Sequence, residues 1–183
     1  MPPVDAALGA RLRILAGLAM IALLSSSCSR KQESPQQRYD AAKALFEQAT
    51  KQFHNPSAFA QGVEQQKLQA QAAENYEKIL RRYPEQTNWC AQALRSLANI
   101  RAAQTNLSEA VRAYAAVTEN YPGDDWETIQ AWKSAADLLW EANRHEDARK
   151  FYQKVVSRFD GTNQPSIVRI VVKGSKARLH GGE

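Results

Sequence analysis

Hydrophobic residues recur at a helical spacing in three segments of the chain, 72–84, 109–122 and 147–160. In each segment a small residue is followed four positions later by an aromatic residue, and three positions after that by an aliphatic residue. This spacing places the three side chains on one face of an α-helix. Proline closes the first two segments and disfavours helix in the residue before it. The pattern therefore predicts three amphipathic helices, each with one face in a core.

The three predicted helices are copies of one repeat, because five columns stay in register with successive members 38 residues apart. The columns are Ala72, Ala110 and Ala148; Tyr76, Tyr114 and Tyr152; Ile79, Val117 and Val155; Tyr83, Tyr121 and Phe159; and Pro84, Pro122 and Asp160. Two helices approach closely only where a side chain is small. We therefore expect each alanine of the first column to face a partner helix.

Candidate partner helices precede the last two copies, where apolar residues recur at helical spacing near 90–104 and 126–142. Short connections carrying Asn106 and Asn143 join them to the helices that follow. Asparagine tolerates the left-handed backbone conformation that such turns require. Each repeat is therefore predicted to be a pair of antiparallel helices joined by a tight turn.

Upstream of the repeats, residues 38–53 form another amphipathic helical pattern. We expect this helix to break at Asn55, Pro56 and Gly62, so that an insertion displaces the leading helix of the first copy. This interpretation gives six helices in the domain.

Downstream, residues 161–183 show no helical period. The run 167–172 favours a short strand, and the residues after it favour disorder. The sequence thus predicts an all-α antiparallel helix-pair solenoid over 38–160, followed by a short non-helical and basic C-terminal tail.

The paired helices resemble the tetratricopeptide (TPR) repeat. The matching residues are Leu94, Leu97, Ala98, Ala110, Tyr114 and Pro122 in the middle copy, and Trp132, Ala136, Ala148 and Tyr152 in the last copy. The period exceeds the usual ~34 residues, and with its closing Tyr-Pro it resembles exported bacterial TPR lipoproteins over about residues 64–160. The outer-membrane assembly lipoprotein and the periplasmic Tol–Pal coordinator are such families.

The N-terminus has the features of an export signal over residues 1–27. Arg11 and Arg13 precede the apolar run 14–24, and small serines follow. Cys28 comes next and resembles the lipidated cysteine of bacterial lipoproteins, although Ser25 stands where that family prefers leucine. Lipidation of Cys28 would leave 28–37 as a tether. In the lipoproteins that it resembles, an aspartate after the cysteine is associated with retention in the inner membrane, so with Ser29 there the resemblance implies the outer membrane. The alternative is ordinary cleavage after Ser27, which releases a soluble exported protein.

Charge argues against a nucleic-acid partner. The chain carries 24 Lys+Arg against 19 Asp+Glu, for a net charge of +5. Much of this excess lies in residues 161–183, so the body of the protein is nearly neutral. A nucleic-acid interface requires a concentrated basic patch.

The sequence also predicts a protein that is not an enzyme and holds no cofactor or metal. It has no glycine-rich phosphate loop, and its three histidines, His54, His145 and His180, are scattered. Three carboxylates cluster in 123–127, which fits a helix N-terminus better than a calcium loop. Cys90 fits a small packing residue.

The resemblance implies that the first helix of each pair lines a groove that binds a protein partner. The groove residues carried over by position are Gln92, Arg95 and Asn99 in the middle copy, and Gln130, Lys133, Asp137 and Trp140 in the last copy. Arg95 and Asn99 resemble part of a carboxylate clamp, but Gln130 and Ser134 stand where the clamp has basic residues. Trp140 is either a binding anchor or a residue packed against the tail.

Together these features predict a non-catalytic interaction scaffold of the bacterial cell envelope, facing the periplasm and held to the membrane through Cys28. Outer-membrane assembly, cell-wall coordination and secretion all fit. The alternative is an accessory subunit that positions an envelope enzyme or transporter.

Overall fold

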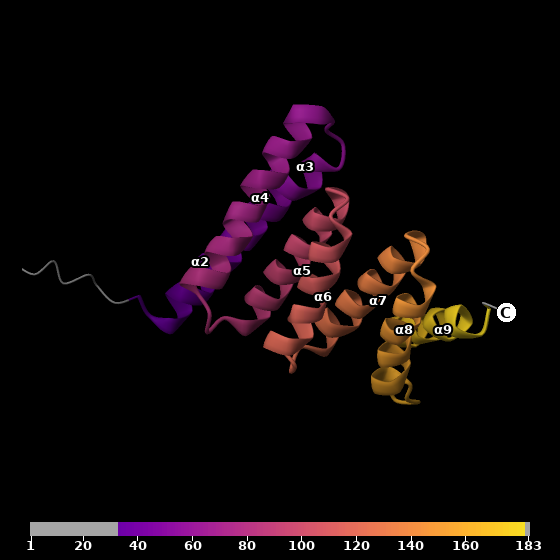
Figure 1. Cartoon of the computed structure of the whole chain (residues 1–183). Coiled ribbons are helices and arrows are strands. Elements are labelled where there is room, and N and C mark those ends of the chain that lie inside the picture. The colour runs from indigo at the N-terminus through magenta and orange to yellow at the C-terminus, as the bar shows by residue number, and fades with distance from the viewer. Residues whose placement is uncertain (1–32, 182–183) are drawn as a thin grey trace, which may run out of the picture. The chain divides into compact units, whose positions relative to one another are not determined.

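A computed structural model describes residues 33–181, and all regular structure in that range is helical (Figure 1). The elements are α2 (Pro35–Gln48), the π-helix η1 (Ala49–His54), α3 (Asn55–Ser57), α4 (Gly62–Arg82), α5 (Thr87–Ala103), α6 (Leu107–Asn120), α7 (Asp125–Glu141), α8 (His145–Phe159) and α9 (Ser166–His180). The predicted all-α solenoid of helix pairs is confirmed. The predicted signal peptide and Cys28 lie outside the described residues, and the last residues of the predicted tether, from Pro35, belong to α2.

Antiparallel pairing follows the repeat columns. Helix α5 packs on α6, α7 on α8, and α6 also packs on α7. The alanine column is fully buried at all three of its positions, Ala72, Ala110 and Ala148. The tyrosine and aliphatic columns are buried as well, and in every copy the tyrosine shares a core cluster with its alanine. The 38-residue register therefore corresponds to one helix pair.

The two tight turns use different residues for the left-handed conformation. Asn143 has a φ of 59°, as its type predicts. In the preceding turn the left-handed residue is Thr105, with a φ of 60°, and not Asn106. Asn106 instead caps α6, because its side-chain oxygen accepts a hydrogen bond from the backbone N–H of Glu109 at 3.3 Å.

In the first helix pair the expected break at Asn55 and Pro56 does not occur. Helix α2 continues through η1 into α3, and the chain leaves the helix only after Ser57. Pro56 lies at the start of α3, directly after the π-helix η1, and the first turn of a helix is where proline is best tolerated. The leading helix is not displaced: α2 and η1 both pack on α4.

The prediction of a non-helical C-terminal tail is wrong. Helix α9 occupies Ser166–His180, so 167–172 is helical and not a strand. Val168, Val172 and Ser175 are buried at helical spacing, and α9 packs on α8. Burial of this face favours the helix although the run is rich in β-branched residues, which prefer strands.

Helix α9 takes the place of a first helix in the stack, because it contacts both α8 and α7. Val168 and Val172 pack on Val155 and Phe159 of α8, much as Ala131 and Ala135 of α7 pack on α6. In this register the face of α7 that packs on α8, which includes Trp132, corresponds in α9 to Ser166, Arg169, Lys173 and Lys176. This face of α9 is therefore charged where the corresponding face of α7 is apolar.

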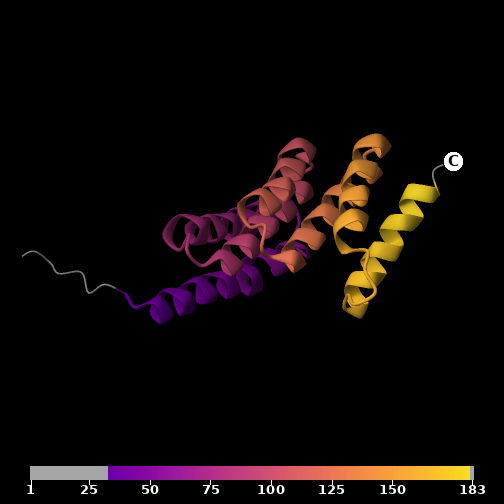
Figure 2. The same ribbon diagram turned by 90° about the horizontal axis from the view of Figure 1, so that it is seen from below.

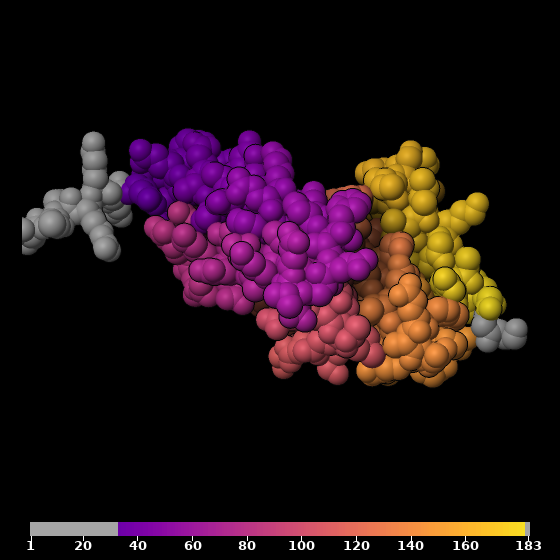
Figure 3. Space-filling view, turned by 90° about the horizontal axis from the view of Figure 1, so that it is seen from above, coloured from indigo at the N-terminus to yellow at the C-terminus, as the bar shows by residue number. Residues whose placement is uncertain are grey.

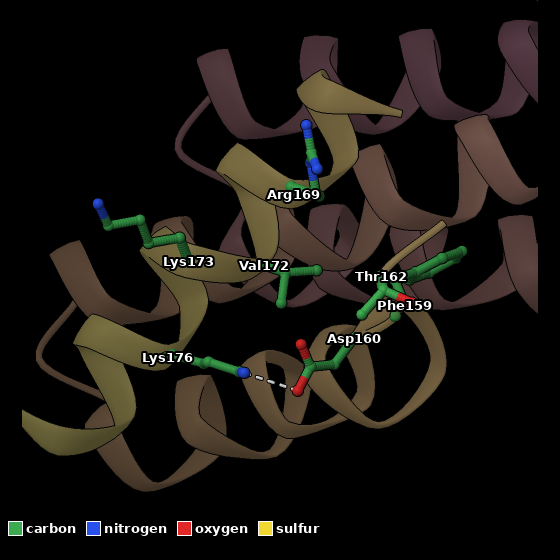
Figure 4. A pocket seen from close by; sticks show the side chains of 8 residues that line it. Phe159, Asp160, Thr162, Arg169, Val172, Lys173 and Lys176 are labelled. Carbon is green, nitrogen blue, oxygen red and sulfur yellow. Dashed lines mark ion pairs between the residues drawn. The ribbon is translucent and has the colours of Figure 1, made fainter. Parts of the chain in front are cut away.

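A pocket of about 640 Å³ lies on this charged side of α9, beside the end of α8. Lys176 pairs with Asp160 at 2.6 Å. Figure 4 shows that Lys173 and Arg169 point in other directions, so the three cations do not converge on a common point. The pocket therefore lacks the geometry of an anion site.

Candidate functional site

The candidate site is the side of the stack lined by the first helices of successive pairs. Helix α2 contacts α5, α5 contacts α7, and α7 contacts α9 (Figure 2). In Figure 3 the surface is hollowed between the magenta residues of the first pair and yellow α9, with orange residues deeper in the hollow. The predicted groove residues lie on α5 and α7, between these two walls.

The repeat tyrosines tie this surface to the core. Their rings are buried, and each hydroxyl bonds to a side chain of the first helix in its own pair. Tyr114 donates to Asn99 at 2.6 Å, and Tyr152 donates to Asp137 at 2.7 Å. Tyr76 contacts both Thr50 at 2.9 Å and the Nδ1 of His54 at 3.1 Å, on the π-helix.

This repeated contact changes the interpretation of Asn99 and Asp137. Both predicted groove residues are partly exposed on their first helices, and each already accepts a hydrogen bond from a tyrosine. Burial raises the pKa of Tyr114, and burial followed by the Asp137 hydrogen bond raises the pKa of Tyr152. The tyrosines therefore remain protonated donors that hold these two side chains in place.

Arg95 occupies the middle of the groove and forms an ion pair with Glu127. The Arg95 side chain is 23% exposed and that of Glu127 only 5% exposed. The positive charge of Arg95 also acts on neighbouring groups, since it contributes to lower the pKa of His54 and to oppose the rise in the pKa of Tyr114. Arg95 is therefore bound within the fold and is not a free clamp residue.

The remaining polar groove residues are held locally. Gln92 donates to Asn88 at 2.9 Å. Lys133 forms an ion pair with Asp137, in which both side chains are partly exposed. Gln130 is half-buried on α7. None of these groups forms a catalytic arrangement with its neighbours.

Trp140 lies where α7 meets α9. Its ring stacks on His145 with centroids 4.4 Å apart, and the guanidinium of Arg178 lies 5.0 Å from its centroid. With Lys133 and Asp137 it lines a pocket of about 260 Å³, whose other wall includes Gly174 and Arg178 of α9. Trp140 thus packs against the C-terminal segment and also borders a groove pocket. Both predicted roles, a binding anchor and a residue packed against the tail, remain consistent with this position.

Sequence reasoning missed two features that shape this side of the stack. The tyrosine hydroxyls were treated only as core, although their 38-residue spacing from one another matches that of Asn99 and Asp137. Ile167 and Ile170 were placed in a strand, although Val168, Val172 and Ser175 have the spacing of a helix with a buried face. That spacing is the signal that could have identified α9.

The three carboxylates of 123–127 each have a structural role. Asp124 caps α7 by accepting the backbone N–H of Glu127 at 3.0 Å. Asp125 pairs with Arg158 at 2.6 Å, and Glu127 pairs with Arg95. Cys90 is buried and donates to the Tyr83 carbonyl at 3.3 Å, and burial raises the pKa of its thiol. The three carboxylates and Cys90 thus take part in helix capping, ion pairing and core packing.

His54 should make stability depend on pH. Burial, and then the charge of Arg95, lower the pKa of His54 below its ordinary 6.5. The unfolded chain therefore takes up the His54 proton more readily than the folded chain. The contribution of neutral His54 to the free energy of unfolding is fully present above pH 6.5 and is lost as the pH drops through the lower folded pKa. Urea unfolding should show a lower free energy of unfolding at pH 5 than at pH 7.5, and a smaller difference in His54→Gln. If His54→Gln shows the same difference between the two pH values as the wild type, this assignment is contradicted. His180→Gln is the control, because His180 is exposed on α9.

No helix within residues 33–181 combines the length and the apolar character that crossing a bilayer requires.

Comparison with known proteins agrees with this architecture. No curated protein sequence matches the chain. Residues 89–160 match the tetratricopeptide repeat family, and this range spans the pairs α5–α6 and α7–α8. The match and the helix-pair fold support a tetratricopeptide-repeat protein, built on a module that generally binds other proteins and is typically not catalytic.

Proposed function

We propose that this protein is a non-catalytic scaffold of the bacterial cell envelope, attached to the outer membrane by a lipid on Cys28, and that its groove binds a protein partner. The observation that carries the proposal is the surface formed by α5, α7 and α9. It combines partly exposed polar side chains with a pocket beside Trp140. Its polar groups are paired with one another and not arranged for chemistry.

The envelope part of the proposal is supported by the N-terminal sequence. An apolar run of signal-peptide length is followed by small residues and then by Cys28. One acyl chain gives only marginal membrane binding, whereas several chains give stable attachment. A lipid-modified N-terminus would hold the solenoid at the membrane surface.

Replacing Cys28 tests the anchor. Cys28→Ser should move the protein from the membrane fraction to the soluble fraction, because the diacylglyceryl group needs the thiol. Immunoblots of fractionated cells measure the distribution, with Cys90→Ser as the control that keeps the lipidation site. If Cys28→Ser remains with membranes as the wild type does, a lipid on Cys28 is not what holds the protein there.

Replacing Trp140 tests the groove. The partner is first recovered by crosslinking from intact cells and identified by mass spectrometry. Trp140→Ala should then weaken its binding by about 2 kcal/mol, the loss expected for an interfacial tryptophan that anchors a contact. Isothermal titration calorimetry measures affinity, and thermal unfolding measures folding in parallel. Normal binding by a variant that melts far lower would limit Trp140 to packing against α9.

A further inference from the structure

Helix α9 presents an apolar row that the fold leaves uncovered. Ile167 is 50% exposed and Ile170 is 66% exposed, although both are large and aliphatic. Gly174 continues the row one helical turn later, and a Cβ added there would meet nothing within 4 Å. The buried face of α9, formed around Val168 and Val172, is a different one. The row is therefore available to a partner.

The apolar row faces the groove and not the charged side of α9. Gly174 and Arg178 line the same pocket as Asp137 and Trp140 of α7. Because Ile170 lies on the helix face of Gly174, it extends this surface from the pocket toward the beginning of α9. The groove thus has a polar section along α5 and an apolar section along α9.

The cations beside the apolar row define the charge of its occupant. Helix α9 carries Arg169, Lys173, Lys176 and Arg178 and no acidic residue. Within residues 33–181, Lys176 is the only one of the four that forms an ion pair, and its partner is Asp160. On the helical wheel Arg178 lies on one side of the row and Lys173 on the other. Arg178 shares a pocket with Asp137 and Glu141 of α7, whereas Lys173 and Arg169 lie outside that pocket. The excess of positive charge on α9 favours an occupant that carries carboxylates.

We infer that the α9 section of the groove binds an acidic amphipathic helix of a partner protein. Its apolar side chains cover Ile167 and Ile170, and its carboxylates face Lys173 and Arg178. The absence of a side chain at Gly174 lets the helix approach closely. A second copy of α9 would bring like charges together, and a planar membrane does not fit a groove walled by α7. This inference rests on the proposed function, because it names the chemistry of the partner at the same groove.

The probe is a synthetic leucine–glutamate peptide that forms an amphipathic helix. Two control peptides are used. The first has lysine in place of glutamate, and the second has the same composition in an order that is not amphipathic. Fluorescence anisotropy with the purified full chain should show binding of the first peptide and at least about tenfold weaker binding of both controls. Added salt should weaken binding, because screened charges contribute to it.

The variant Ile167→Asp/Ile170→Asp should lose about tenfold or more in affinity. Both side chains are exposed, so its helix content by circular dichroism should equal that of the wild type. The matched control is Phe59→Asp/Val63→Asp, which changes two apolar residues that are 90% and 83% exposed in the connection before α4 and at its start. This control should bind like the wild type.

The inference fails if the wild type does not bind the leucine–glutamate peptide. It also fails if the Ile167→Asp/Ile170→Asp variant binds this peptide as tightly as the wild type does. Binding only to phosphatidylglycerol vesicles would assign the row to a membrane, and a dimer that this variant dissociates in sedimentation velocity would assign it to a second copy. If the natural partner binds this variant normally but loses affinity in Trp140→Ala, the proposed function stands and the α9 inference fails. Normal binding of the partner by both variants would reject the groove itself.

Discussion

Arg95→Ala should destabilise the protein by about 3 kcal/mol, although Arg95 belongs to the groove surface. Its partner Glu127 has a side chain that is only 5% exposed, so removal of the guanidinium leaves a carboxylate buried without a counter-charge. Breaking a buried ion pair from one side costs about 3–5 kcal/mol, and the partial exposure of Arg95 favours the lower end. Urea unfolding with a two-state fit measures the change.

A double variant separates this mechanism from loss of packing. Arg95→Ala/Glu127→Ala removes both charges, so it should be more stable than Arg95→Ala alone. Lys133→Ala is the matched control, because the Lys133–Asp137 pair is 43% and 37% exposed, and exposed pairs contribute at most about 1 kcal/mol. Equal stability of Arg95→Ala and the wild type would show that Glu127 is not held by this pair.

The expected role of Arg95 in binding therefore changes. The sequence alone suggests a surface charge whose removal weakens association and leaves folding intact. Residue type and repeat position identify Arg95 as a groove residue, but they do not reveal that the buried carboxylate of Glu127 lies opposite it. That contact depends on how α7 begins, where Asp124 caps the helix and Glu127 occupies its first turn.

The core of the solenoid could be predicted because local and tertiary preferences agree there. The spacing of Ala148, Tyr152 and Val155 requires one buried helical face, and all three residues are buried. In α9 the two preferences conflict: the spacing of Val168 and Val172 indicates a buried helical face, but the β-branched residues and Gly174 oppose the helix that packing on α8 favours. The continuous helix through Asn55 and Pro56 was missed for a related reason, since local signals of a break are overridden by contacts with α4.

The sequence predicts which helices carry the proposed groove residues, but not the contacts that those residues make. Repeat register places Gln92, Lys133 and Trp140 on the first helices, where the structure has them. It does not indicate that Asn99 and Asp137 are bound by tyrosines, because those bonds depend on the depth at which each hydroxyl emerges from the core. The α9 wall could not be included in the site until the tail was known to be helical.

Ala110→Trp and Ala148→Trp should each lower the free energy of unfolding by about 1–3 kcal/mol or more, because overpacking a close helix contact forces neighbouring side chains and backbone to move. Both alanines have no exposed surface, and each belongs to a core cluster with the tyrosine one turn later, Tyr114 or Tyr152. Thermal and urea unfolding measure the change.

Ala44→Trp is the matched control for overpacking, because Ala44 is an exposed alanine within α2. It carries the same modest loss of helix propensity from alanine to tryptophan, less than about 1 kcal/mol, without the steric conflict. The difference between Ala148→Trp and Ala44→Trp therefore isolates the cost of separating α7 from α8. If the three variants unfold alike, the alanine column does not mark the contact between paired helices, and the 38-residue register does not define the fold. If only the buried pair is destabilised, the close approach of paired helices at these alanines determines how each repeat packs.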